Sequence, residues 1–86
     1  MVNVGERWKF ATAQVDFTIV SLDDEFAYYK MNWSEHQRQV WLNNPVVYYV
    51  YDGWGRARAI WRYHNPDKIC KVQLSSFVNG KVVRSD

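Results

Sequence analysis

Cysteine is scarce in this chain, and long apolar runs and a strong net charge are lacking. Cys70 is its only cysteine, so no disulfide can form within the chain. Its longest apolar run, Val46 to Tyr51, has six residues, far fewer than the ~20 that cross a membrane. The net charge of +2 is small for a strong nucleic-acid binder. Disulfide scaffolds and membrane-spanning helices are therefore excluded, and we expect no membrane partner.

Residues that carry metal or acid–base chemistry are equally scarce. His36, His64 and Cys70 lie far apart and form no ligand spacing. The run Asp23-Asp24-Glu25 is expected to be a solvated turn, because consecutive carboxylates on a turn point apart. The loop around Gly53 lacks the strand-to-helix context of a phosphate-binding loop. We therefore predict no metal, no cofactor and no catalytic residue.

The beginning of the chain lacks a secretory pattern. Residues 1–6 contain no basic stretch followed by an apolar run of ~7–15 residues. A single free cysteine is what a reducing compartment permits. We expect a cytoplasmic protein.

Large aromatic side chains are what the chain has in excess. Fifteen of its 86 residues are aromatic, and five of these are tryptophan. A domain of this size buries only somewhat more than ~60% of its unfolded surface. Some of the aromatic surface is therefore expected to face a partner, and a homodimer is the usual form of self-association.

Short alternating segments predict a mainly β protein. Turn residues separate them, and no linker or repeat divides residues 1–86, so we expect one small β domain of 5–7 short strands and at most one short helix. The clearest strands are expected at 15–22, 26–33, 46–51, 56–63 and 69–74. In the second of these, Ala27 and Tyr29 belong to the more apolar face, which is expected to point inward.

Two further segments are interpreted from their cap and turn residues. Ser34 and Gln37 would suit a capping box that opens a short helix, whereas Val40 and Trp41 favour the return strand of a hairpin. We favour the hairpin for residues 34–42. Near the end of the chain, Asn79-Gly80 predicts a tight hairpin turn between strands at 77–78 and 81–83.

The strand pattern carries one family resemblance. An early hairpin that joins residues 5–8 to 17–20, followed by a late strand at 71–77, resembles the SH3-like barrels of short accessory proteins from phages and mobile elements. The resemblance implies a small barrel or a strongly bent antiparallel sheet, and a host protein as partner. It carries no motif and assigns no residue.

The richest candidate site is the segment 54–64. If residues 56–63 form a strand, Arg56, Arg58 and Arg62 share one face, and the opposite face of Ala57, Ala59, Trp61 and Tyr63 is expected to be core. The arginine row is suited to successive phosphates, with aromatic rings to stack on bases. Charges that protect an edge strand, or a contact with an acidic protein, are the alternatives. The candidate binding residues are Tyr48, Trp54, Arg56, Arg58, Arg62 and His64.

Six tyrosines form a second candidate surface. Neighbours such as Tyr48 and Tyr49 point to opposite faces of a strand, so each such pair sends one ring outward. Together these features predict a non-enzymatic binding module that acts through an aromatic and arginine surface, by protein–protein contact or self-association. The alternatives are single-stranded nucleic-acid or RNA binding through residues 56–62, and a small-ligand or enzyme site at a homo-oligomer interface.

Overall fold

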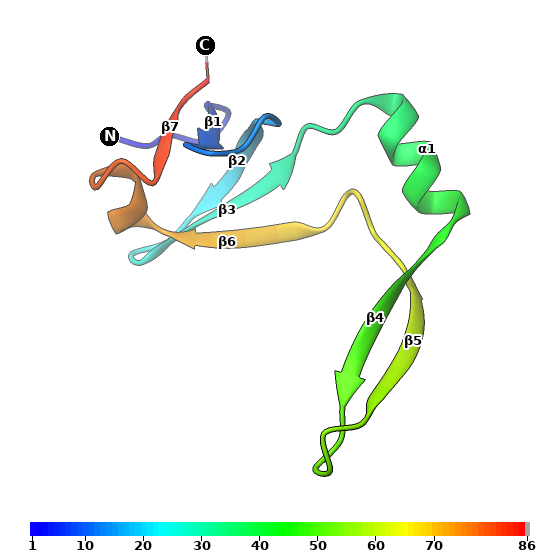
Figure 1. The fold of residues 1–86 in the computed structure, drawn as a ribbon. Helices are drawn as coiled ribbons and strands as arrows, with labels where there is room; N and C mark the ends of the chain where they lie inside the picture. The colour runs from blue at the N-terminus through cyan, green and yellow to red at the C-terminus, as the bar shows by residue number, and fades with distance from the viewer. Residues whose placement is uncertain (86) are drawn as a thin grey trace. The chain divides into compact units, whose positions relative to one another are not determined.

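The computed structural model describes residues 1–85, and seven β-strands, one α-helix and one 3-10 helix lie in this range (Figure 1). The prediction of a mainly β protein is confirmed. The described chain divides into two compact units. The sheet unit consists of Met1–Asn32 and the segment that begins at Asp67, and the hairpin unit is Trp33–Pro66.

The sheet unit is built on five antiparallel strands. These are β1 (Arg7–Phe10), β2 (Phe17–Leu22), β3 (Phe26–Met31), β6 (Ile69–Gln73) and β7 (Val82–Arg84), in the spatial order β6-β3-β2-β1-β7. The sheet is open, with β6 and β7 as its edges, so the bent sheet and not the closed barrel describes it. The pairing of β2 with β3 shifts between Ile19 and Ser21, and such a bulge bends a strand.

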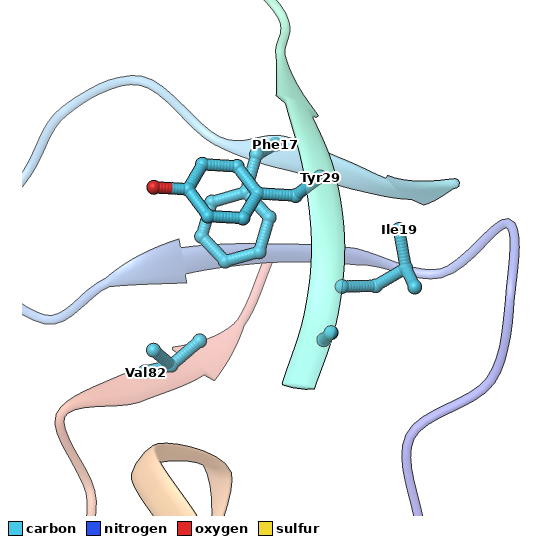
Figure 2. Close-up of a cluster of buried hydrophobic side chains, with 5 residues drawn as sticks. Phe17, Ile19, Tyr29 and Val82 are labelled. Atoms are coloured by element: carbon cyan, nitrogen blue, oxygen red, sulfur yellow. The ribbon is translucent and has the colours of Figure 1, made fainter. Parts of the chain in front are cut away.

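The core of this unit lies on one side of the sheet. Alternation along the strands brings together five buried side chains, from Phe17, Ile19, Ala27, Tyr29 and Val82. Figure 2 shows the rings of Phe17 and Tyr29 against each other, with centroids 4.3 Å apart. The predicted inward face of residues 26–33 is confirmed at Ala27 and Tyr29.

The last strand corrects one prediction. Residues 77–78 are not a hairpin partner of 81–83, because Leu74–Phe77 forms the 3-10 helix η1 and packs the Phe77 ring edge-on against Trp8, centroids 4.9 Å apart. β7 pairs with β1 instead, with Val82 opposite Phe10. Gly80 does lie in a turn, at a φ of +86°, but this turn leads from η1 into the sheet edge.

The hairpin unit corrects another prediction. Residues Glu35–Asn43 form the helix α1, and the preferred hairpin at 34–42 is wrong. The Ser34 hydroxyl accepts a hydrogen bond from the Gln37 N–H at 3.2 Å, as an N-cap does. Glu35 lies in the first turn and accepts a bond from the Gln39 side chain at 2.9 Å. These local contacts outweigh the weak strand preference of Val40 and Trp41.

The rest of the unit is a two-stranded sheet. β4 (Pro45–Tyr51) and β5 (Ala57–Tyr63) pair with each other along their whole length (Figure 1). Of residues 33–66, only Pro66 is buried. Apart from Pro66, this unit therefore lacks buried apolar side chains of the kind that hold the sheet unit together.

Candidate functional site

The β4–β5 hairpin has two chemically different faces. Side chains alternate between faces along a strand, and directly opposed residues share a face. The register, with Tyr49 opposite Ala59 and Tyr48 opposite Ile60, therefore sorts the side chains into two sets. The aromatic face holds Pro45, Val47, Tyr49, Tyr51, Ala57, Ala59, Trp61 and Tyr63. The arginine face holds Val46, Tyr48, Val50, Arg58, Ile60 and Arg62.

The aromatic face carries no charge, and most of it is exposed to solvent. Its four rings, Tyr49, Tyr51, Trp61 and Tyr63, are 63%, 70%, 65% and 68% exposed. The side chains of Ala57, Ala59, Trp61 and Tyr63, which the sequence analysis assigned to the core, are thus on the surface. The grouping of these residues on one face was right, but no element of the hairpin unit covers it. Soluble proteins rarely expose so continuous an apolar patch without a use for it.

Helix α1 meets the other side of the hairpin. Its Trp41 ring packs edge-on against His64, with centroids 4.6 Å apart, and against Trp33, at 4.3 Å. His64 continues the alternation of Arg62, and the Tyr48 hydroxyl lies 3.4 Å from its Nδ1. The base of the arginine face is therefore partly covered, and Val46 and Ile60 are half-buried.

The turn between the strands is ordered by one carboxylate. The Asp52 N–H donates to the Arg56 carbonyl at 3.1 Å, and the Gly55 N–H donates to the Asp52 carbonyl at 3.1 Å. Gly55 has a φ of +76°, so the loop is a three-residue hairpin turn that ends in a left-handed glycine. The Asp52 Oδ1 also accepts the N–H groups of Arg56 and Trp54, at 3.0 and 2.8 Å.

The hydrogen bonds to Asp52 lower the pKa of its carboxyl group, and the turn that they order leaves Trp54 exposed. The two backbone donors, from Arg56 and then Trp54, hold the pKa of Asp52 below its usual value. The Arg56 guanidinium adds an ion pair to the same carboxylate, with Nε and Oδ2 3.1 Å apart. The indole of Trp54 is left at the tip of the hairpin, 85% exposed between two glycines.

The structure divides the six predicted site residues into groups. Tyr48, Arg58, Arg62 and His64 lie on the same side of the hairpin. Arg56 directly precedes β5, and its guanidinium pairs with Asp52 across the turn. Trp54 stands at the tip, apart from the others. Sequence reasoning missed Trp61 as a site residue, because it assigned the face of Trp61 to the core.

Neither metal ligands nor membrane spans are found in the part of the chain that the structure describes. In residues 1–85, no three side chains of His, Cys, Asp or Glu gather to hold a metal ion. No helix in this range has the length and apolarity to cross a membrane. No protein-family model, no curated protein and no solved structure matches the chain.

Proposed function

We propose that the protein is a non-enzymatic binding module, and that it self-associates through the aromatic face of the β4–β5 hairpin. The observation that carries this proposal is the gathering of four rings on one uncharged face, each about two-thirds exposed. An isolated two-stranded sheet is only marginally stable in water, so covering this face would also stabilise the hairpin.

The size of the face suits a second copy of the chain. At ~150–250 Å² per aromatic side chain, four rings that are about two-thirds exposed offer roughly 400–650 Å² per copy. Two copies would bury roughly 800–1,300 Å², which reaches the lower end of stable interfaces at ~1,200–2,000 Å². A two-fold axis places the same patch on both sides of the interface. An uncharged patch can face itself without repulsion.

The absence of charge also argues for a second copy over a charged partner. Nothing in the aromatic face would select an acidic or a basic surface, and the guanidinium groups of Arg58 and Arg62 lie on the opposite face. Stacking two hairpins by their aromatic faces leaves those charges in water. The half-buried single cysteine, Cys70, supports a cytoplasmic setting for this association.

Mass in solution tests the proposal. Light scattering after size-exclusion chromatography should give a dimer whose mass is insensitive to salt, because the contact is apolar. Tyr49→Glu places a charge in the aromatic face and should weaken the dimer. Val50→Glu is the matched control, since it puts the same charge on the neighbouring residue of the arginine face, opposite Arg58. A monomeric native chain, or equal dimer dissociation constants for the native chain and Tyr49→Glu, would contradict the proposal.

A second candidate function is supported by the arginine face. Within residues 1–85, Arg58 and Arg62 have no acidic partner, and Tyr48 lies across from Ile60 between them. The two guanidinium groups stand four residues apart on one strand, roughly 13 Å, which spans about two phosphate spacings of a single strand. The tyrosine ring between them is suited to stacking on a base.

Binding of a labelled single-stranded oligonucleotide, followed by fluorescence anisotropy, tests this second candidate. The double variant Arg58→Ala/Arg62→Ala should lose affinity and reduce the salt dependence by roughly 1.4 in the log–log slope, at ~0.7 per lost contact. Arg56→Ala is the control, because Arg56 is engaged with Asp52 and should matter little. Binding that is unaffected by salt or by the double variant would exclude this function.

A further inference from the structure

The sheet unit contains an apolar cavity that the proposed dimer does not use. Its volume is about 300 Å³, and its lining includes Trp8, Leu22, Asp23, Leu74, Phe77 and Val78. The edge-on pair of Trp8 and Phe77 forms one wall. Val78, at the rim, is 89% exposed. This volume lies at the lower end of the range for ligand sites and is sufficient for one aromatic side chain.

The rim of the cavity on the side of Asp23 is acidic. Asp23 begins the run Asp23-Asp24-Glu25. Its Oδ1 accepts the N–H groups of Glu25 and Phe26, and its Oδ2 accepts the Tyr28 hydroxyl at 2.6 Å. These bonds, the one from Tyr28 foremost, lower the pKa of Asp23. The carboxylate is therefore held in place and ionised at the entrance to an apolar cavity.

The hairpin tip is complementary to such a cavity. Trp54 presents an exposed indole on a turn that Asp52 has already ordered, so little conformational entropy remains to be lost on docking. Arg58 lies a few residues along β5 and has no acidic partner in the described part of the chain. Tryptophan and arginine are the residues most enriched among interface hot spots.

We propose that the cavity of the sheet unit receives Trp54 from a second copy of this chain, with the acidic turn 23–25 facing the arginines beside the tip. The inference rests on the proposed self-association and adds a second mode of contact to it. The two surfaces in this contact differ, so the contact is head-to-tail and can continue beyond a dimer.

The experiment isolates this contact from the aromatic face by introducing Tyr49→Glu into every protein used. A labelled Tyr49→Glu/Trp54→Ser protein keeps the cavity and lacks the indole. An unlabelled Tyr49→Glu/Val78→Arg protein keeps the indole and has its own cavity blocked, at a position whose exposure tolerates the change. The unlabelled protein is titrated into the labelled protein, and nitrogen–proton correlation spectra of the labelled protein are recorded.

Saturable shifts of the Trp8 indole N–H and of the amides of Leu74 and Phe77 are expected. The same titration with a titrant that also carries Trp54→Ser should give none, and a labelled protein that carries Val78→Arg should not respond. Absence of shifts, or equal shifts with the titrant that lacks Trp54, would overturn the inference. The masses of Trp54→Ser and of Tyr49→Glu/Trp54→Ser, both measured without the indole contact, decide the proposed function, so the two can fail separately.

Discussion

Glu6 and Arg84 are joined by an ion pair, although 78 residues separate them in the chain. The Glu6 carboxylate also accepts the Asn3 N–H at 2.7 Å and the Trp8 indole N–H at 3.3 Å. It thereby links the start of β1 to the end of β7, its neighbour in the sheet. The bond from Asn3 is the largest cause that lowers the pKa of Glu6, from an ordinary 4.5 to about 2.

This pair predicts an acid-sensitive contribution to stability. A carboxylate whose pKa is depressed by folding contributes stability that is fully present above about pH 4.5 and is lost as the pH falls towards 2. Thermal unfolding of the native chain and of Glu6→Gln should therefore differ most at pH 6 and converge near pH 2. A constant difference across this range would show that the charge of Glu6 is not responsible.

Truncation of an aromatic ring is expected to lower the free energy of unfolding by different amounts in the two units. Phe17 is fully buried in the sheet unit, and Phe17→Ala should cost about 3–5 kcal/mol in the free energy of unfolding. Trp61 is a larger ring on an exposed face, and Trp61→Ala should cost the dilute monomer less than about 1 kcal/mol. Denaturant unfolding at low protein concentration compares them. Equal costs would mean that Trp61 is covered within one copy.

The N-cap at Ser34 is expected to stabilise the first turn of α1. Ser34→Ala removes the acceptor of the Gln37 N–H and should destabilise the helix by about 1 kcal/mol. Ser34→Asp keeps an acceptor at the same place and should retain the helix. Circular dichroism and the hydrogen exchange of the α1 amides measure the difference. If the alanine and aspartate variants behave alike, the cap does not stabilise the helix.

The two glycines beside Trp54 form a matched pair. Gly55 has a φ of +76°, and Gly55→Ala should destabilise the turn by roughly 1–2 kcal/mol. Gly53 is not in the left-handed region, and an added Cβ would contact nothing within 4 Å, so Gly53→Ala should be neutral or mildly stabilising. Exchange of the Asp52 N–H should accelerate about 5–30-fold in Gly55→Ala only. The opposite order would contradict the assigned turn.

The sequence predicted features that are encoded locally. Alternation located the strands around Phe17, Ala27 and Ile60, and it assigned Ala27 and Tyr29 to the core. The sets of residues that share a face in β5 were also right. These successes have one cause, since the period of a strand is a property of its own residues.

The failures concern partners that lie outside the local sequence. The Asn79-Gly80 turn did not reveal that β7 pairs with β1, because that pairing joins distant residues. The residues of the aromatic face were grouped correctly but were expected to be buried, because alternation does not say what covers a face. At 34–42, the intrinsic preference of two residues was given more weight than the cap at Ser34.

The position at which the hairpin unit is inserted into the sheet determines which changes in sequence the fold can tolerate. Lys30 of β3 is the register partner of Ile69 of β6, so the chain leaves the sheet and returns to it on adjacent strands. Residues 33–66 are thus an insertion at a position where an ordinary hairpin would need only a short turn. No residue of the inserted segment belongs to the core cluster around Phe17. The hairpin unit can therefore be exchanged, shortened or diversified while the supporting sheet keeps the same sequence.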